Sequence, residues 1–301
     1  CYVGNVFSYR PDGNNLEVFC FPTGTKMPEV KKAYADWLLA EGRLENPFYT
    51  NLMLWGTTAL AKGKFVRPEW LAELERIQKE LTQVNPTVVV ALGNTACWAL
   101  QRNPRIGTIR GTVLPGILTP HKVLPTYHPA FVLRNYTQKV VVMADLMKAR
   151  QESLSPEIVY PQREILIEPS ADVLPYIEAK IRNQSGPLAF DIETKHGCIL
   201  CISLCRDPSY TVTIPFVDRT KPQFAYWPDA RDESVALGMV MRLLGDSTIP
   251  KVAQNGLYDI QWIADKWGFP VYGFSEDTML LHHALFPELP KNLGFMGSVY
   301  T

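Results

Sequence analysis

Leu188-Ala189-Phe190-Asp191-Ile192-Glu193-Thr194 is the stretch that decides how the second half of this 301-residue chain folds. It is expected to be a buried strand, because apolar residues dominate it and side chains alternate between the two faces of a strand. Phe190 and Ile192 then point into a core, while Asp191 and Glu193 leave together from the other face. Two carboxylates at that spacing repel each other, and a divalent cation with oxygen ligands relieves the repulsion.

A third acid lies further along, in Lys251–Ala264, where a short apolar strand ends at Asn255 and a helix begins. The spacing predicts an apolar helix face, with Asp259 near the helix start on the other face. The residues expected on the apolar face are Leu257, Ile260, Ile263 and Ala264. Strands and helices also end in solvated acids for no functional reason, so each acid alone is a weak signal. Their combination favours a metal site.

The D-x-E pair and the N-x3-D spacing at a helix start resemble the first two motifs of the DEDD-type 3′–5′ exonucleases. The resemblance implies a ribonuclease H-like mixed sheet in which Asp191, Glu193 and Asp259 are catalytic and hold two Mg²⁺ or Mn²⁺ ions for phosphodiester hydrolysis. It also implies that Asn255 binds substrate. Oxygen ligands without a thiol suit these ions.

The family has a third motif with a fourth acid about four residues after a Tyr or His, and we do not find it in this chain. Glu276–Leu281 resembles the helix that precedes that motif in polymerase-linked exonucleases. We therefore expect the fourth acid to lie beyond Thr301. Asp277 is interpreted as a helix cap rather than a metal ligand.

The first half of the chain is predicted to be an α/β domain with a parallel sheet. Val88–Leu92 is a continuous apolar run, which is typical of a buried parallel strand, and Gly93–Ala96 turns into a helix. Lys122–Pro125 is a second strand, which delivers Thr126–Ala130 at its end. Strand, helix and strand in succession imply a right-handed connection, with ligands at the carboxyl ends of the strands.

Three other predictions concern the segments before that sheet. Tyr2–Phe7 is expected to be a strand, and residues 41–64 are expected to be irregular. Val30–Leu39 and Pro68–Leu81 carry amphipathic patterns and are predicted helices, the second with Pro at its first turn.

Four segments, in this order, resemble the uracil-DNA glycosylase superfamily, nearest its family IV-like members: Tyr2–Asn14, Pro86–Leu100, Arg110-Gly111 and Pro125–Asn135. The resemblance implies that a uracil flipped out of DNA is gripped by the amide of Asn5. The imidazole of His128 would stabilise charge on the uracil O2 oxygen as the glycosidic bond breaks. Tyr127 and Arg134 are expected to bind substrate beside it.

The chain departs from that family in places. Its first motif, a Gly/Pro-rich loop, is expected upstream of Cys1. Ser8 and the region of Trp70 stand where two iron–sulfur ligands of many family IV members lie, so no iron–sulfur cluster is expected. His128 as a structural cap and Asn5 as a plain strand-end amide remain alternatives.

Cys198, Cys201 and Cys205 form C-x2-C-x3-C, which suggests a metal knuckle, but no second Cys or His pair follows at finger spacing. The same residues fit buried thiols of a strand that pairs with Tyr210–Pro215 through a turn at Asp207-Pro208-Ser209. We favour strand thiols over zinc. Scattered cysteines fit a reducing compartment.

Composition is that of an ordinary globular protein, with 47% hydrophobic and 20% charged residues. Residues 1–155 hold 18 Lys and Arg against 12 Asp and Glu, and residues 156–301 hold the reverse. The basic half suits a polyanion and the acidic half suits cations, although neither imbalance is large. Without a long apolar window or a leader, we expect no membrane contact and a cytoplasmic location, in the host cell if the protein is viral.

The predicted organisation is a uracil-DNA glycosylase-like domain in residues 1–152, a linker in 153–163 and an exonuclease domain in 164–301. This order resembles the N-terminal region of a phage family A DNA polymerase, truncated at both ends. The resemblance implies proofreading at single-stranded DNA 3′ ends, uracil-containing DNA as a further substrate, and a polymerase domain as partner. The alternative is a non-catalytic uracil-DNA-binding or scaffold module attached to a degraded exonuclease.

Overall fold

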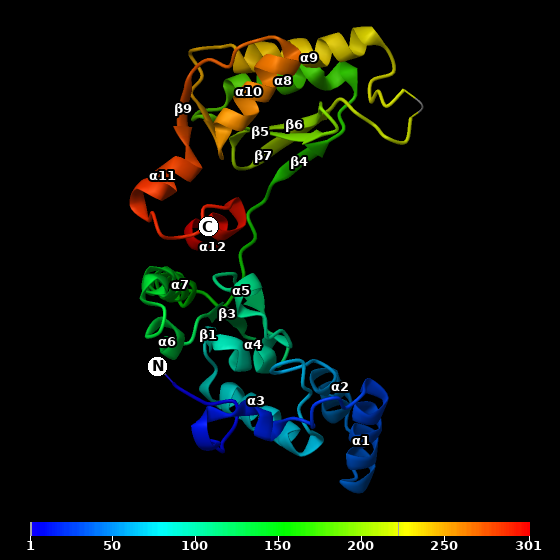
Figure 1. Cartoon of the computed structure of the whole chain (residues 1–301), viewed down its shortest axis with the longest axis vertical. Coiled ribbons are helices and arrows are strands. Elements are labelled where there is room, and N and C mark those ends of the chain that lie inside the picture. Colours follow the sequence, from blue (N-terminus) through cyan, green and yellow to red (C-terminus); the bar gives the residue numbers. More distant parts are fainter. Residues whose placement is uncertain (1, 222) are drawn as a thin grey trace. The chain divides into compact units, whose positions relative to one another are not determined.

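The computed structural model describes residues 2–221 and 223–301, with the side chain of Asn14 not described. The chain divides into two compact units. The first comprises residues up to Val159 together with Gly297–Thr301, and the second comprises Tyr160–Met296. Figure 1 traces both units along the sequence. No helix in the described part of the chain is long and apolar enough to cross a membrane.

The first unit contains a small sheet whose two longer strands are parallel. Strands β1 (Val88–Leu92) and β3 (Lys122–Thr126) pair in parallel, and helix α4 (Gly93–Gln101) follows β1 directly. The short strand β2 (Leu114–Pro115) pairs antiparallel with the other edge of β3. The predicted strands and the helix between them are confirmed, so residues that follow β3 lie at the carboxyl end of a parallel pair.

Helices surround this sheet and supply most of the first unit's core. Their bounds are α1 Met27–Ala40, α2 Pro47–Gly56, α3 Ala72–Val84, α5 Ile106–Ile109, α6 Pro129–Val132 and α7 Lys139–Glu152. The predicted helices α1 and α3 are confirmed, the latter continuing a 3-10 turn at Pro68–Leu71. The prediction that residues 41–64 are irregular was wrong. Asn46 caps the amide of Phe48 and Pro47 opens α2, which buries Leu52 and Trp55.

The predicted strand at Tyr2–Phe7 is absent, because its backbone has found partners other than a strand. The carbonyls of Asn5 and Val6 accept hydrogen bonds from Arg76 Nη2 on α3, at 2.7 and 3.2 Å. Val3 is 82% exposed. Alternating apolar residues predict a strand only where a sheet edge is offered, and here the segment lies along a helix instead.

The second unit is a mixed sheet in the order β4-β7-β6-β5-β8-β9. Strands β5, β6 and β7 are antiparallel neighbours, whereas β8 and β9 join parallel to β5, and β4 joins parallel to β7. This order is the ribonuclease H-like arrangement that the sequence predicts, with β4 added at one edge. The strand bounds are β4 Glu164–Ile167, β5 Leu188–Lys195, β6 Cys198–Asp207, β7 Tyr210–Pro215, β8 Lys251–Ala253 and β9 Phe274–Asp277.

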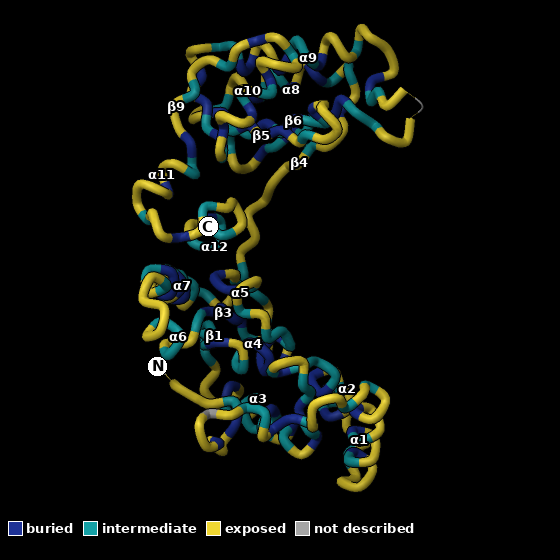
Figure 2. The backbone as a smooth tube through the Cα atoms, in the orientation of Figure 1, coloured by how far each residue is buried: buried dark blue, intermediate teal, exposed yellow. Residues whose placement is uncertain are grey.

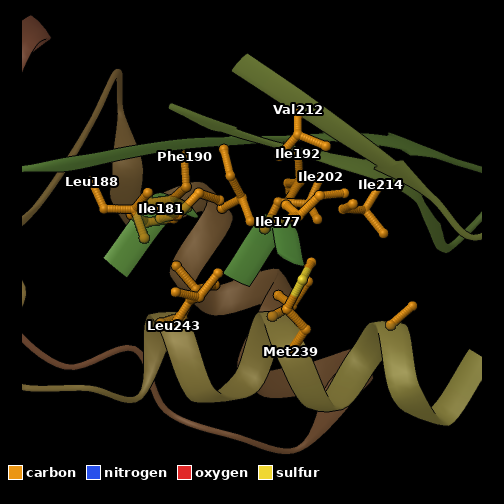
Figure 3. Close-up of a cluster of buried hydrophobic side chains, with 14 of the residues drawn as sticks. Ile177, Ile181, Leu188, Phe190, Ile192, Ile202, Val212, Ile214, Met239 and Leu243 are labelled. Carbon is orange, nitrogen blue, oxygen red and sulfur yellow. The ribbon is translucent and has the colours of Figure 1, made fainter. Parts of the chain in front are cut away.

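Helices α8 (Leu174–Asn183) and α9 (Ala230–Leu244) cover one face of the second sheet. Figure 3 shows their apolar side chains packed toward the inward residues of β5, β6 and β7. Phe190 and Ile192 belong to this core, as predicted, at 3% and 5% exposure. The remaining helices are α10 Gly256–Trp267, α11 Thr278–Leu285 and α12 Leu293–Tyr300.

The cysteine-containing segment forms the predicted hairpin of β6 and β7, with Asp207 paired to Tyr210 at its turn. The prediction that its thiols are buried was wrong. Cys198 is exposed, and Cys201 and Cys205 are only partly buried. The buried residues of this strand are apolar and include Ile202 and Leu204, so the cysteines lie on the face away from the core.

Between α7, which ends at Glu152, and β4, which begins at Glu164, the chain forms no helix or strand. Figure 2 shows this segment as largely exposed. Pro156 and Pro161 each lack a backbone N–H, which discourages any continuation of the helix or an early start of the strand.

Candidate functional site

Asp259 of α10 reaches the middle of strand β5. Its Oδ1 accepts a hydrogen bond from the backbone amide of Ile192 at 2.9 Å. Strand β8 pairs with β5 only at Leu188 and Ala189. Beyond that point the N–H of Ile192 has no strand partner on this side, and the Asp259 carboxylate takes that place. The third predicted acid therefore lies against the residue between the first two.

Asp191 and Glu193 leave β5 on the face opposite the core, and both are exposed. A register shift in the pairing with β6 falls directly after Glu193. Such a bulge bends a strand and changes the direction of its side chains, and bulges are frequent next to active sites. The extra residue, Leu200, lies in β6, so β5 continues to Lys195 and its two carboxylates lie beside this irregularity of the neighbouring strand.

Burial and neighbouring charges raise the pKa values of Asp259 and Asp191. Burial raises the pKa of Asp259 to about 6, and the negative charge of Asp191 adds to the effect against the opposing hydrogen bond from Ile192. Burial also raises the pKa of Asp191, with Glu193 as the second cause. Raised carboxyl pKa values are a feature of functional sites, and the joint role of the three acids stays a prediction.

The donor chemistry of these acids suits Mg²⁺ or Mn²⁺, because each offers a hard oxygen ligand and their negative charges are close enough to repel. The positions of these side chains match a metal site less well than their chemistry does. Within residues 2–221 and 223–301, no three Asp, Glu, His or Cys side chains form a group that could hold a metal ion as they stand. The acids therefore fit a divalent cation in charge and kind, without forming a closed ligand set.

The prediction for the faces of α10 was wrong. Asp259 is 3% exposed and shares the buried face with Gly256 and Ile263. Leu257, expected on the apolar face, is 66% exposed, and Ala264 is exposed as well. A buried carboxylate is costly unless it is hydrogen-bonded, and the N–H of Ile192 supplies that bond.

Asp277 is confirmed as a helix cap. Its Oδ1 accepts from the amides of Met279 and Leu280 at the start of α11, at 2.9 and 3.4 Å. The same carboxylate also accepts from the amides of Asn255 and Gly256, at 3.1 and 2.9 Å. It therefore fixes the turn that leads from β8 into α10, which carries Asp259.

Asn255 is exposed, and its backbone lies in the left-handed region at φ 57°. Asn tolerates that conformation better than most residues. Its side chain makes no capping bond to α10. Its expected contact with substrate remains a prediction.

Two features beside the acids were not foreseen from the sequence. Thr194 Oγ1 and the hydroxyl of Tyr258 hydrogen-bond at 2.6 Å, which ties the end of β5 to α10. Cys201 is paired directly opposite Glu193 in the β5–β6 register, and burial followed by the Glu193 charge raises the pKa of its thiol. Strand alternation could have shown this position, because Cys201 and Ser203 of β6 pair with Glu193 and Asp191 and lie on the same face as these acids.

In the first unit, His128 caps helix α6. Its Nδ1 accepts a hydrogen bond from the amide of Ala130 at 3.1 Å. A neutral imidazole with Nδ1 as acceptor carries its proton on Nε2, so Nε2–H is directed away from the helix as a donor. The side chain is exposed, and a β-carbon on Gly93 would lie 3.0 Å from the His128 Cβ. The ends of β1 and β3 thus meet at His128, and its capping bond leaves the predicted catalytic role possible in geometry, as a prediction.

The other predicted residues of the first unit are dispersed. Asn5 is exposed, and its carbonyl is held by Arg76. Tyr127 packs its ring against Phe131 with centroids 4.9 Å apart, and Arg134 is exposed. In the described part of the chain, no hydrogen bond joins Asn5 to His128, Tyr127 or Arg134. Their joint role as a uracil pocket remains a prediction.

The fold and these two sets of residues define a two-unit α/β protein that carries a strand-end histidine in one unit and a carboxylate cluster in the other. Residues 1–150 match the family model described as the Uracil DNA glycosylase superfamily. The first unit therefore contains a uracil-DNA glycosylase-like domain. A Type-4 uracil-DNA glycosylase of Thermotoga maritima is 37% identical over 71 residues, which cover 22% of this chain and 36% of that enzyme. The match thus spans little more than a third of the relative's length.

Among solved structures, RNase D of Escherichia coli, an exoribonuclease involved in structured RNA processing, is similar at a TM-score of 0.34 and 18% identity. The likeness covers 46% of this chain and 33% of that one. RNase D of Trypanosoma brucei is similar at a TM-score of 0.31 and 14% identity, over 39% of each chain. TM-scores of this size decide nothing by themselves about activity. The description of the second unit therefore depends on its own sheet order and on the position of Asp259, and not on these similarities.

Proposed function

We propose that this chain is the N-terminal part of a phage family A DNA polymerase, in which the second unit proofreads by removing nucleotides from DNA 3′ ends. The first unit is a uracil-DNA glycosylase-like module that engages the same nucleic acid. The substrates are a single-stranded DNA 3′ end and uracil-containing DNA, and the partner is the polymerase domain of the full-length protein. Mismatched 3′ ends fray into single strands at low cost, which gives such a nuclease its selectivity.

The observation that carries the nuclease proposal is the hydrogen bond from the Ile192 amide to Asp259. A residue 67 positions away in the sequence is thereby held against the strand that presents Asp191 and Glu193. Burying a carboxylate is costly even when a backbone amide binds it. Here the cost of burying Asp259 is accepted next to two further acids.

In the proposed site, Asp191, Glu193 and Asp259 would hold Mg²⁺ or Mn²⁺. When bound, such ions lower the pKa of water and stabilise the charge on the leaving 3′ oxygen of a phosphodiester. The chain's own contribution is positional. Ile192 orients the Asp259 carboxylate, and the backbone bonds of Asp277 fix the turn into α10.

The test is Mn²⁺-dependent degradation of a single-stranded DNA oligonucleotide by the full-length protein. A 3′-labelled strand should release labelled mononucleotide first, and a 5′-labelled strand should yield a descending ladder. Asp259→Ala should reduce the rate by about 100-fold or more, as expected for loss of a metal ligand. Asp265→Ala is the matched control, because Asp265 is an exposed acid on the same helix.

Equal rates for the Asp259→Ala and Asp265→Ala proteins would refute the nuclease proposal. Release of labelled mononucleotide first from the 5′-labelled strand would refute the proposed polarity. A full-length protein that extends primers normally but shows no Mn²⁺-dependent degradation would leave the second unit as a scaffold.

Uracil excision by the first unit is the second candidate function, favoured by the orientation of His128. Because its Nδ1 accepts from Ala130, the Nε2–H donor is available to an oxygen of a bound base. An Asn amide such as that of Asn5 offers an acceptor and donors that match the uracil N3–H and O4, whereas cytosine presents the reverse pattern.

The measurement is cleavage, after alkali treatment, of a single-stranded oligonucleotide with one uracil. Excision produces an abasic site that breaks under alkali, and His128→Ala should lower its rate by about 100-fold. A protein that binds uracil-containing DNA more tightly than the thymine-containing control, yet leaves no abasic product, would be the non-catalytic binding module instead.

A further inference from the structure

A buried ion pair lies at the end of strand β3, two residues before His128. Arg110 and Asp145 are 3% and 1% exposed. The Arg110 Nε and Nη2 atoms donate to the two carboxylate oxygens of Asp145, at 3.2 and 2.5 Å. The hydroxyl of Thr126, the last residue of β3, donates to Asp145 Oδ2 at 2.5 Å. One carboxylate therefore binds both a charged side chain and the strand end.

The same cluster fixes the backbone of three neighbouring segments. The amide of Gly111 donates to the carbonyl of Pro125 in β3 at 2.9 Å, and Lys148 Nζ of α7 donates to the carbonyl of Gly111 at 2.8 Å. Gly111 has φ +74°, and a β-carbon there would lie 2.5 Å from the Ser298 carbonyl oxygen and 2.9 Å from Asp145 Oδ1. The left-handed backbone and these two close oxygens both require a residue without a side chain.

Arg110 has a further partner within the first unit. Its Nη1 donates to the hydroxyl of Ser298 at 2.6 Å, and its Nη2 donates to the Ser298 carbonyl at 3.3 Å. With the bonds to Asp145, these contacts hold the whole guanidinium plane. Arg110 is thus a rigid support for the Asp145 carboxylate rather than a mobile surface residue.

A second ion pair, with a buried lysine and a partly exposed acid, lies at the opposite end of the same strand. Lys122 opens β3 and is 2% exposed, and its Nζ donates to Glu152 Oε2 at 2.6 Å. Glu152, like Asp145, belongs to α7. Lys122 and Thr126 of β3 thus both bind acids of α7, but only the Thr126–Asp145 contact lies at the end of β3 that continues into His128.

We propose that Asp145 is a positioning residue for His128, acting through Thr126 and through the Arg110-Gly111 segment. The His128 ring takes its orientation from the Ala130 amide, and that bond forms only if the chain leaves β3 in one direction. Asp145 fixes this direction from behind the strand. The inference rests on the proposed uracil-excision role of His128.

A buried charge at Asp145 favours one conformation of the end of β3 over others. An apolar contact behind β3 would tolerate several packings, whereas a buried carboxylate must keep all of its hydrogen bonds at once. Asp145 lies on the inward face of α7 with Val141, Val142 and Ala149. Burying a charge among those apolar residues is unfavourable, and the hydrogen bonds from Arg110 and Thr126 offset this cost.

The experiment compares Thr126→Val, Asp145→Asn and the matched control Glu152→Gln in the full 301-residue chain. Histidine labelled with ¹⁵N reports the tautomer of His128 by NMR, and hydrogen exchange reports the Ala130 amide. In Thr126→Val and Asp145→Asn, we expect mixed tautomers and exchange of the Ala130 amide at least about tenfold faster. Glu152→Gln should lower the melting temperature but leave both signals at their wild-type values.

Uracil excision is the second readout. Both β3-end variants should lower kcat by about tenfold or more with little change in KM, because a misoriented imidazole affects the transition state more than binding. Thr126→Val leaves the Arg110–Asp145 pair intact, so it decides the matter if Asp145→Asn does not fold. Unchanged His128 signals in Thr126→Val, or equal changes in Glu152→Gln, would overturn the positioning role.

The two proposals fail in different ways. A wild-type chain that leaves no abasic product would refute excision, while the NMR signals of the variants would still decide whether Asp145 orients His128. Excision by the wild type at an unchanged kcat in both β3-end variants would refute the positioning role alone.

Discussion

The carboxylate of Asp259 and the backbone amide of Ile192 are joined by a 2.9 Å hydrogen bond across 67 positions of sequence. This bond connects the helix of the second motif to the strand of the first. It also explains why an acid can occupy the inward face of α10, since the strand amide it binds would otherwise be unpaired at the end of β8. The N–H of Ile192, which lacks a strand partner on this side, therefore holds Asp259 beside Asp191 and Glu193.

The raised pKa of Asp259 makes the second unit's stability depend on pH. In the folded chain this pKa is about 6, against an ordinary value of 3.8. Between about pH 4 and 6, the folded state keeps a proton that the unfolded state has lost, so the free energy of unfolding falls as pH rises. Asp259→Asn removes this effect. In a chelator-containing buffer, the variant should gain up to about 3 kcal/mol on the wild type between pH 4 and pH 7.

Chemical denaturation at several pH values measures this difference. A stability difference between the two proteins that stays constant from pH 4 to pH 7 would show that Asp259 titrates normally in the folded chain.

Divalent cations should stabilise the folded chain at neutral pH. At Mn²⁺ concentrations well above the dissociation constant, we expect roughly 1–3 kcal/mol of added stability, because a ligand that binds only the folded state shifts the unfolding equilibrium. The effect should shrink at pH 5, where a proton competes for Asp259. Asp191→Asn should abolish it, and Asp265→Asn should not. Thermal melts with Mn²⁺ and with a chelator provide the measurement, and an equal shift in all three proteins would contradict binding at these acids.

Asp277 should be among the most sensitive capping residues of the second unit. Its carboxylate accepts four backbone hydrogen bonds, from Asn255, Gly256, Met279 and Leu280. Asp277→Ala leaves these donors without their partner and should cost about 2–4 kcal/mol of unfolding free energy.

The control for that substitution is Asp229→Ala. Asp229 caps α9 through one bond to the amide of Asp232 and should cost only about 1 kcal/mol. Urea denaturation of both variants measures the comparison. Equal losses would mean that the double capping by Asp277 adds nothing.

A methyl group on Gly93 should disturb the His128 site. Gly93 has φ +81°, and its added β-carbon would lie 3.0 Å from that of His128. Gly93→Ala combines left-handed backbone strain, about 1 kcal/mol or more, with displacement of the imidazole. We expect slower uracil excision and an altered His128 NMR signal.

Gly107→Ala is the matched control, because an added β-carbon there has no atom within 4 Å. It should leave excision unchanged and raise stability slightly, by about 0.5 kcal/mol. Wild-type His128 signals in Gly93→Ala would show that the added methyl group does not displace the His128 side chain.

Several elements followed from local patterns alone. The alternation in Leu188–Thr194 predicted which side chains of β5 are buried, and the turn at Asp207-Pro208-Ser209 predicted the hairpin of β6 and β7. Asp277 was recognised as a cap from its position before a helix. In each case neighbouring residues decide the outcome, because strand alternation, tight turns and helix caps depend on a few adjacent positions.

Other features depended on groups distant in sequence. Tyr2–Phe7 has the residues of a strand, but its carbonyls bind Arg76 of α3. Residues 47–56 lack a clear amphipathic stripe, and tertiary burial of Leu52 and Trp55 stabilises α2. Asp145 follows the inward period of α7 as a single acid among apolar residues, and this pattern becomes interpretable only once Arg110 and Thr126 are seen beside it.

The sequence by itself determined the two α/β halves, the strand that carries Asp191 and Glu193, and the acids and histidine worth examining. Only the tertiary structure decided that Asp259 faces inward and binds Ile192, and that Asp145 stands behind the strand leading to His128. The reason is physical. The spacing of apolar residues predicts which face of a helix or strand is buried, and it places acids on the exposed face. A carboxylate can nevertheless be buried where the fold supplies a hydrogen-bond donor for it. Such donors come from strands and helices that are far apart in the chain.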